Sequence, residues 1–446
     1  MRPNAKLMKA ALTGALGGLL YGFDTIVISG IIDSVTRLYK LSPTFSFHSV
    51  GLTVAASPLG NILGCYCAGV IGQKIGTRSA LRMAAAIYFC ACLVAAFSVG
   101  WPMLLIGRFV GGMAIGACSV LGPVYITELS PAQWRGRLVG LFQINIVSGI
   151  LIGLISNYLV RLANLGDLEW HVMLGVVAIP TLIFLVLLMS IPLSPRWSAS
   201  RNQIDEALRV LKLVGAPDPK AELADIRSAL QAEHAKVDES VFQWKYRYPL
   251  FLAITIGAFN QLTGINAILS YVHTILTAAG VGQISSDQQA IAIGASNLIF
   301  TLVGMAMIDK FGRKSLLVMG AIGTAICLSG VAWILHVHRF GALVPLLLMV
   351  FIAFFALSQG LVVFVYIGEV FPNAVRAKGQ GVGNASLSAF NMAILYSFPA
   401  LMGISLQTPF VIFAAATVVQ LIVVSLFFPE TKGQTLEQLQ RKLLRA

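Results

Sequence analysis

The sequence predicts an all-α membrane protein with twelve transmembrane helices. Three observations support this: the composition, a regular series of apolar segments, and an internal repeat. Of the 446 residues, 57% are hydrophobic and only 11% are charged, whereas an average soluble domain carries about 25% charged residues. Such a chain has too few polar side chains to cover a surface that faces water. We therefore expect lipid to be its solvent.

Twelve apolar stretches are long enough to cross a bilayer as a helix, which takes about 20 residues. They fall roughly at residues 9–30, 49–72, 79–99, 102–126, 137–160, 171–191, 249–277, 287–308, 315–336, 342–367, 379–403 and 408–428. The first is too long for a cleaved signal peptide and lacks its small-residue cleavage pattern. The predicted domains are an N-terminal six-helix bundle (1–193), a cytoplasmic linker (194–247) and a C-terminal six-helix bundle with a short tail (248–446). Within the linker, 203–213 and 220–235 alternate charged and apolar residues at helical spacing, which is typical of amphipathic helices at a membrane surface.

The basic residues explain the net charge of +13 and predict the orientation. If the N-terminus is cytoplasmic, 26 of the 31 Lys and Arg residues fall in cytoplasmic segments, and the opposite topology inverts that ratio. We therefore expect both termini in the cytoplasm and no nucleic-acid partner. The six cysteines lie inside apolar stretches, where a thiol behaves as a small hydrophobe. No metal site and no cofactor are expected.

An internal repeat relates the two halves of the chain. The segment from Glu128 to Arg135, after the fourth span, matches the segment from Glu369 to Arg376, after the tenth, in the offsets of its glutamate, proline and arginine. The turn at 72–78, between spans two and three, matches 308–314, between spans eight and nine. Proline-containing segments after spans six and twelve form a third pair. Three matched pairs in one order indicate a duplicated six-helix unit, as in transporters that rock two bundles about a central site.

Two opposite charges, Asp24 in the first span and Arg108 in the fourth, are the only ionised residues that we place well inside the spans. An intramembrane charge costs at least about 2.5–3.5 kcal/mol and indicates a functional site by default. Each lies about 9–10 Å from the outer end of its span at 1.5 Å per residue, so we expect the two to pair. The pair either links two helices statically or lets Asp24 take up a proton when Arg108 moves away.

Taken in order, the motifs of this chain resemble those of the sugar porter family of the major facilitator superfamily. The resemblance covers essentially the whole chain, and it rests on Gly17–Gly30, Gly107–Gly112, Pro123–Glu128, Arg135–Arg137, Pro192–Trp197, Gln261–Asn266 and Pro429–Gly433. It is closest to bacterial proton-coupled sugar symporters, such as xylose–proton symporters. It implies the major facilitator fold of two pseudo-symmetric six-helix bundles. It also implies a location in a bacterial inner membrane and a monomer.

The resemblance further implies proton-coupled symport of a sugar or sugar-like polar solute by alternating access. Asp24 and Arg108 would be the coupling residues, because symporters of this family carry aspartate at that position and facilitators usually lack it. The positions that line the solute in this family are Gln143, Asn260, Gln261, Asn266, Asn297, Phe364 and Asn391. Amides suit hydroxyl groups because they both donate and accept hydrogen bonds, although amides also join helices in membranes. Gly264 lies among them and predicts a break in the seventh span.

Spans ten and eleven depart from the family pattern. Phe364 stands where a tryptophan is usual, and Leu387-Ser388 aligns with a usual polar–tryptophan pair, which leaves Asn391 as the polar residue of that span. A polyol or a more apolar solute therefore stays open beside a hexose or a pentose. His273, two residues after Tyr271, either packs as a neutral side chain or lines the outer vestibule.

The repeated loop motifs predict a charged latch on the cytoplasmic side. Its members are Glu128, Arg135, Glu369, Arg376, Arg78, Arg313 and Lys314. The alternative is that the basic residues only anchor the topology. The latch should be weaker in the first half, because Thr77 replaces a usual basic residue and Leu193 a usual glutamate.

Two other functions are alternatives to symport. A passive facilitator would use Asp24 only as a structural residue. A non-transporting nutrient sensor would typically carry a long signalling tail, and only a short one follows Phe428. An enzyme is not expected, because no nucleophile–base or metal-ligand pattern is present.

Overall fold

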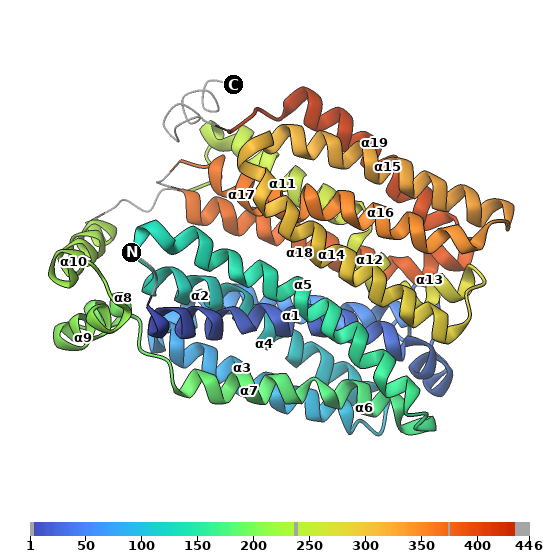
Figure 1. Cartoon of the computed structure of the whole chain (residues 1–446), viewed down its shortest axis with the longest axis horizontal. Coiled ribbons are helices and arrows are strands. Elements are labelled where there is room, and N and C mark those ends of the chain that lie inside the picture. The colour runs from blue at the N-terminus through green and yellow to red at the C-terminus, as the bar shows by residue number, and fades with distance from the viewer. Residues whose placement is uncertain (1–3, 236–239, 373–374, 433–446) are drawn as a thin grey trace. The chain divides into compact units, whose positions relative to one another are not determined.

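The computed structural model describes residues 4–235, 240–372 and 375–432, and these ranges fold almost entirely as α-helices (Figure 1). Within them, the only β feature is an isolated bridge between Ser42 and Ser49. Twelve helical segments of the described ranges are long and apolar enough to cross a membrane. This number agrees with the twelve spans predicted from the sequence.

The helices follow the predicted order, with several spans made of more than one helix. The first six spans consist of α1 (Ala5–Tyr39), α2 (Val50–Ile75), α3 (Thr77–Ala96), α4 (Trp101–Leu129), α5 (Ala132–Leu162), and η1 (Gly166–Leu168) with α6 (Glu169–Val176) and α7 (Ala178–Met189). Three short helices come next: α8 (Pro195–Ser200), α9 (Ile204–Val214) and α10 (Pro219–Ala235). The seventh span consists of η2 (Trp244–Tyr246), α11 (Arg247–Leu262) and α12 (Ile265–Ser270), and α13 (Val272–Ala278) follows it. The eighth and ninth spans are α14 (Gln283–Phe311) and α15 (Arg313–Val337). The tenth consists of η3 (Gly341–Leu343), α16 (Val344–Leu357) and α17 (Gln359–Glu369), and the last two are α18 (Arg376–Ile404) and α19 (Thr408–Phe427).

The chain divides into two compact units. The first unit holds Met1–Thr25, Ala56–Ser156 and Asn164–Asp238, and the second holds Ile26–Ala55, Asn157–Ala163 and Glu239–Ala446. The division does not follow the midpoint of the sequence. The C-terminal parts of α1 and α5, together with the start of α2, belong to the second unit although they come from the first half of the chain.

Glycines bring α2 and α4 close together in the first unit. A Cβ atom at Gly60 would meet the backbone of Phe109, and one at Gly112 would meet the backbone of Ser57. Small residues allow this approach, which is how helices associate in lipid, where burial of apolar surface gives no advantage. The close packing sets Ser57 of α2 against the helix that carries Arg108.

The seventh span is interrupted at Gly264, as predicted. This glycine has φ = +79°, a conformation that costs glycine little, and a Cβ atom on it would meet the ring of Phe413. The tenth span is also interrupted, at Ser358 between α16 and α17. In a membrane, interrupted helices occur where the freed polar groups are buried in protein or line a cavity. Both breaks therefore indicate a polar interior in the second unit.

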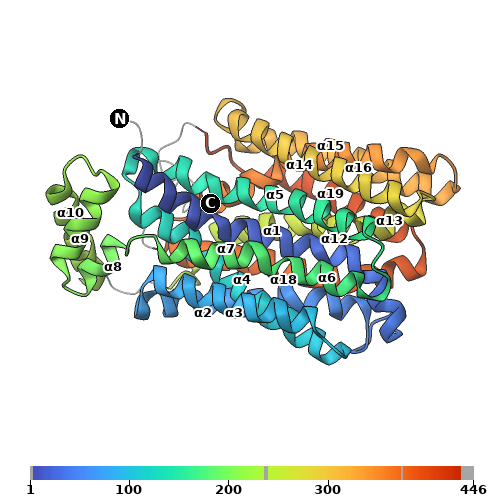
Figure 2. The ribbon, with the colours of Figure 1, turned by 60° about the horizontal axis from the view of Figure 1, so that its bottom comes forward.

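The two amphipathic segments predicted in the linker correspond to α9 and α10. With α8 they pack around a small apolar core that includes Ala207, Leu211 and Leu223. Figures 1 and 2 show the three helices gathered at one end of the long helices of their unit. Gly215, with φ = +77°, ends α9 and turns the chain toward α10.

Candidate functional site

Asp24 and Arg108 meet in the interior of the first unit, as their predicted depths require. Arg108 Nη1 donates to Asp24 Oδ1 at 2.9 Å. Tyr88 of α3 donates to the same oxygen at 3.2 Å, and Ser57 of α2 donates to Oδ2 at 2.6 Å. Asp24 is 9% exposed and Arg108 5%. Four helices of one unit thus converge on a single carboxylate that is almost shielded from solvent.

The contacts around Asp24 match an ionised carboxylate, which only accepts hydrogen bonds. Arg108 can only donate, but the hydroxyl groups of Tyr88 and Ser57 can donate or accept. If Oδ2 gained a proton, the Ser57 hydroxyl at 2.6 Å could rotate and accept from it. Arg108 would then face a neutral partner.

The second unit holds a chain of buried amides where the sequence predicted a solute site. Gln261 Nε2 donates to Asn260 Oδ1, and Asn266 Nδ2 donates to Gln261 Oε1, both at 2.8 Å. Asn266 Nδ2 also lies 3.1 Å from Asn391 Oδ1. These residues come from α11, α12 and α18, on both sides of the break at Gly264. We call them the amide cluster, and each can exchange an internal hydrogen bond for one to a hydroxyl group.

Two further glutamines that the sequence analysis missed extend the amide cluster to α17 and α19. Gln359, at the start of α17, accepts from Asn260 Nδ2 through its backbone oxygen at 3.3 Å, and its Nε2 donates to Gln420 Oε1 of α19 at 3.1 Å. Both side chains are buried. The available signal was a glutamine inside an otherwise apolar span, directly after Ser358.

The remaining predicted solute residues are not joined to the amide cluster by hydrogen bonds in the described ranges. Asn297 on α14 is buried, and its Oδ1 lies 3.5 Å from Thr301 Oγ1. Phe364 on α17 leaves 49% of its surface exposed. Gln143 is half-buried on α5 in the first unit. The roles of these three residues stay predictions.

In the second unit, the repeated loop motif forms an ion pair. Arg313 Nη2 lies 3.1 Å from Glu369 Oε1, and Thr431 donates to Glu369 Oε2 at 2.6 Å. The next carboxylate, Glu430, accepts from the backbone N–H of Arg313 and Lys314 at 2.8 and 3.0 Å, at the start of α15. Burial acts to raise the pKa of Glu430, but backbone N–H groups of Lys432, Arg313, Lys314 and Thr431 outweigh it and lower the pKa.

In the first unit, the same motif combines a neutral contact with an electrostatic attraction between Glu128 and Arg196. Thr77 donates to Glu128 Oε2 at 2.6 Å. Arg78 Nη1 donates to the backbone oxygen of Ile191 at 3.0 Å, and Arg135 is exposed.

Two other latch candidates use their side chains to contact backbone oxygens. Arg376 donates to the oxygen of Phe371, and Lys314 donates to that of Ser425. Thr77 gives Glu128 a hydroxyl group where Glu369 has the guanidinium of Arg313, and the weakness of the first half stays a prediction. A state-dependent latch stays a prediction.

Comparison with known proteins identifies the family. The family model described as "Sugar (and other) transporter" matches residues 10–443. This chain belongs to that family. The match spans all twelve apolar helices, so the protein is a multi-pass membrane protein of the transporter class and not an enzyme.

Individual relatives agree along the whole length of this transporter. An arabinose–proton symporter of Bacillus subtilis is 34% identical over 438 residues, covering 96% of this chain and 92% of that protein. The D-xylose–proton symporter of Escherichia coli is 30% identical, covering 98% and 96%. A solved inward-open structure of the Escherichia coli xylose transporter superimposes with a TM-score of 0.86 at 30% identity, covering 98% of this chain and 99% of that one. The two six-helix bundles of the major facilitator fold are therefore established for this transporter.

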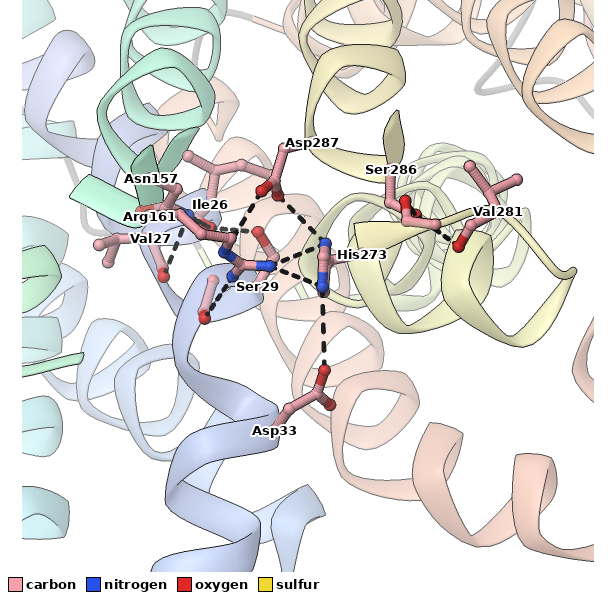
Figure 3. A network of polar contacts seen from close by, with 12 residues as sticks. Ile26, Val27, Ser29, Asp33, Asn157, Arg161, His273, Val281, Ser286 and Asp287 are labelled. Atoms are coloured by element: carbon pink, nitrogen blue, oxygen red, sulfur yellow. Dashed lines mark hydrogen bonds and ion pairs between the residues drawn. The ribbon is translucent and has the colours of Figure 1, made fainter. Parts of the chain in front are cut away.

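The transporter also contains a second charged cluster, at the ends of the spans, beside the Asp24–Arg108 pair that the sequence placed well inside them. Arg161 of α5 and Asp287 of α14 are ion-paired, with Nε and Oδ2 3.3 Å apart and side chains 15% and 7% exposed. His273 lies between them and Asp33 (Figure 3). Sequence reasoning placed Arg161 outside its span, because only packing reveals that the end of α5 is covered. His273 was the one residue of this cluster that the sequence analysis singled out, and it is buried and in contact with charged side chains.

Proposed function

We propose that this protein is a secondary active transporter that carries a sugar or a sugar-like polyol together with a proton by alternating access. The buried Asp24–Arg108 pair, 2.9 Å apart within a transporter fold, carries this proposal. Its relatives named as arabinose–proton and xylose–proton symporters support the same solute class and the same driving ion.

We place the transporter in a bacterial inner membrane with both termini in the cytoplasm. The support is the distribution of basic residues, 26 of 31 of which fall on one side. In this orientation, Gly30 and the C-terminal end of α5 lie toward the outside, and the loop motifs at Glu128 and Glu369 lie toward the cytoplasm. The bundles 1–193 and 248–446 would rock within a monomer, joined by the linker 194–247, with lipid around them.

Asp24 is the proposed proton carrier. A proton on its carboxylate removes one buried charge and weakens the attraction to Arg108, so α1 and α4 become free to change their packing. Ser57 keeps the neutral acid satisfied by accepting its O–H. Release of the proton toward the cytoplasm restores the ion pair and returns the transporter to its starting state.

The amide cluster is the proposed solute site. Its internal hydrogen bonds satisfy Asn260, Gln261 and Asn266 when no solute is bound, and hydroxyl groups of a sugar can replace them one for one. The breaks at Gly264 and Ser358 border this cluster. A solute bound there would contact helices that can bend, which ties its occupancy to the conformation of the second unit.

Replacement of Asp24 by asparagine tests the proposal. In proteoliposomes with an imposed pH gradient, the wild type is expected to concentrate radiolabelled arabinose or xylose and to raise the external pH as solute enters. Asp24→Asn should lose accumulation and alkalinisation, at least about a hundredfold, while exchange of solute between equal pools persists, because the asparagine cannot carry a proton.

Asp167→Asn is the matched control, because it makes the same chemical change at an exposed residue of η1 in the same unit. It should behave as the wild type. If Asp24→Asn still concentrates solute, Asp24 is not the proton carrier. If the wild type moves solute without any alkalinisation, the protein is a facilitator and the symport proposal is wrong.

A further inference from the structure

A cluster of charged and titratable side chains that the proposed transport sites do not use lies within the second unit. It consists of Asp33 on α1, Arg161 on α5, His273 on α13 and Asp287 on α14 (Figure 3). We call it the outer network. Asp33 and Arg161 come from the first half of the sequence, and His273 and Asp287 come from the second. The outer network therefore joins the two halves of the chain at one end of the helices.

His273 is the centre of the outer network. Its Nε2 lies 2.8 Å from Arg161 Nη1, and its Nδ1 lies 3.1 Å from Asp287 Oδ1. Asp33 Oδ2 is farther from Nε2, at 4.0 Å. Arg161 also donates from Nη2 to the backbone oxygen of Gly30 at 3.1 Å. The ring of His273 is 3% exposed, so these contacts replace water almost completely.

These distances fit a neutral imidazole. A guanidinium has five donors and no acceptor, and Arg161 Nη1 lies 2.8 Å from Nε2 and 3.4 Å from Nδ1. With the nearer nitrogen, Nε2, as the acceptor, Nδ1–H donates to Asp287 Oδ1 at 3.1 Å. A proton on Nε2 would set two donors against each other at 2.8 Å. The nearest carboxylate for that new N–H is Asp33, at 4.0 Å and 43% exposed.

The charged groups that face His273 are therefore one cation and two carboxylates. Arg161 faces it from α5, Asp33 from α1 and Asp287 from α14. The adjoining helix α12 (Ile265–Ser270) has the sequence Ile-Asn-Ala-Ile-Leu-Ser and adds no titratable group. A protonated ring would repel Arg161 and turn toward the carboxylates, so the contact between α5 and α13 would be lost first.

We propose that the outer network is a proton-sensitive lock on the outer face of the transporter. Neutral His273 holds α5, and through it α1, against α13, and protonation breaks its contact with Arg161. This inference rests on the proposed function and orientation, which place this end of the helices outside. Histidine changes its charge between about pH 5 and 8. External acid, the condition that drives symport, would therefore also open the lock, separately from the proton that Asp24 carries.

Hydrogen–deuterium exchange of the full-length protein in detergent tests the lock without solute or gradient. The measured segments are 26–39, 157–162 and 272–279, compared at about pH 7.5 and about pH 5.5 after correction for the intrinsic pH dependence of exchange. In the wild type, acid is expected to raise their exchange at least about tenfold, the effect of losing one hydrogen bond to a charged group. Segments of α3 and α7 should not change.

Substitutions isolate the role of the ring. His273→Gln keeps one acceptor for Arg161 and one donor for Asp287 but cannot gain a proton, so exchange should stay low at both pH values. Arg161→Gln removes the cation and should raise exchange at both. His48→Gln is the matched control, because His48 belongs to the same unit, is exposed, and its Nε2 lies 2.8 Å from the backbone oxygen of Tyr39. It should respond to acid as the wild type does.

The outcomes separate the lock from the transport proposal. An acid response that persists in His273→Gln or in Arg161→Gln overturns the lock, as does a wild type whose exchange is unchanged or falls in acid. If acid raises exchange as predicted but no proton-driven uptake is measured, the lock proposal stands and the symport proposal is wrong. If the protein concentrates solute but its exchange does not rise in acid, only the lock proposal is wrong.

Discussion

The two copies of the repeated loop motif hold their helices by different forces. In the second unit, Glu369 pairs with Arg313 across 3.1 Å. At the equivalent place in the first unit, Glu128 accepts from the hydroxyl of Thr77 at 2.6 Å. One cluster contains an ion pair of two partly buried charges, whereas in the other the equivalent donor is a neutral hydroxyl and Arg196 is the cation that attracts the carboxylate.

The scaffold of the two motifs has nevertheless stayed the same. Tyr125 donates to the backbone oxygen of Pro192 at 2.8 Å, and its counterpart Tyr366 donates to that of Pro429 at 3.1 Å. Gly76 and Gly312 both have φ = +86° before the helix that follows. The tyrosine and glycine contacts therefore fix the backbone of the motif. The two halves of the chain differ instead in the charged side chains that surround this backbone.

The largest expected difference between the clusters is the cost of losing the carboxylate. Glu369→Gln should destabilise the protein by about 2 kcal/mol, because it weakens the contacts of Arg313, whose side chain is only 14% exposed. Glu128→Gln should cost about 0.5–1 kcal/mol, because an amide oxygen can still accept from Thr77. Thermal unfolding of the purified protein in detergent at neutral pH measures both.

Equal losses of melting temperature in the two variants would mean that the ion pair adds nothing to the motif. A loss that disappears for Glu369→Gln in high salt would instead show that the pair is effectively at the surface, since screening acts mainly on exposed charges.

The sequence predicted most of the fold and about half of the candidate site. Hydropathy gives the twelve spans because a lipid-embedded helix must be apolar along its whole length. Depth alone predicted that Asp24 and Arg108 meet, since both are counted from the same membrane face. The glycine at position 264 predicted a break because few other residues tolerate its conformation.

The rest depends on packing that one sequence does not encode locally. Asp287 lies near the start of α14 and resembles a solvent-exposed helix-end residue until α5 is placed beside it. The hydrogen bond between Gln359 and Gln420 joins residues that are 61 positions apart in the sequence. Nothing in the sequence of either span indicates that the two side chains are partners. The substitution of Thr77 for a basic residue was visible in the sequence, but only the geometry shows that its hydroxyl still satisfies Glu128.

A smaller expected effect is a difference in the pH dependence of stability between the units. The pKa of Glu430 is lowered from its usual value near 4.5. Its ionised form therefore adds stability that is fully present above about pH 4.5 and is lost as the pH falls through the lowered pKa. The melting temperature of Glu430→Gln should lie below that of the wild type at pH 6–7. The gap should close in acid.

Glu222 of α10, in the first unit, provides the opposite case. Burial is the main cause that raises its pKa, and Arg135 acts against it. Folding therefore favours its protonated form, so Glu222→Gln should be no less stable than the wild type at neutral pH. If the two variants lost stability equally at neutral pH and kept that loss in acid, ionisation of Glu430 would not be what holds the start of α15.

The smallest expected effect comes from giving the first unit a carboxylate at the position that corresponds to Glu430. Leu193 follows Pro192 as Glu430 follows Pro429, and the start of α3 has no side-chain cap. Leu193→Glu should place a carboxylate near the free N–H groups of Thr77 and Arg78 and stabilise the protein by about 0.3–1 kcal/mol relative to Leu193→Gln. The glutamine variant is the baseline, because both substitutions lose the same apolar contacts of a half-buried leucine.

The comparison is made by thermal unfolding at neutral pH and again in acid. A carboxylate that caps α3 should lose its advantage over glutamine once it is protonated, and high salt should reduce the advantage in part. If Leu193→Glu and Leu193→Gln unfold at the same temperature at neutral pH, the first unit cannot use a charge at this position. The neutral contact between Thr77 and Glu128 would then reflect a real difference in the helix start of the first unit, and the two copies would be equivalent in backbone trace only.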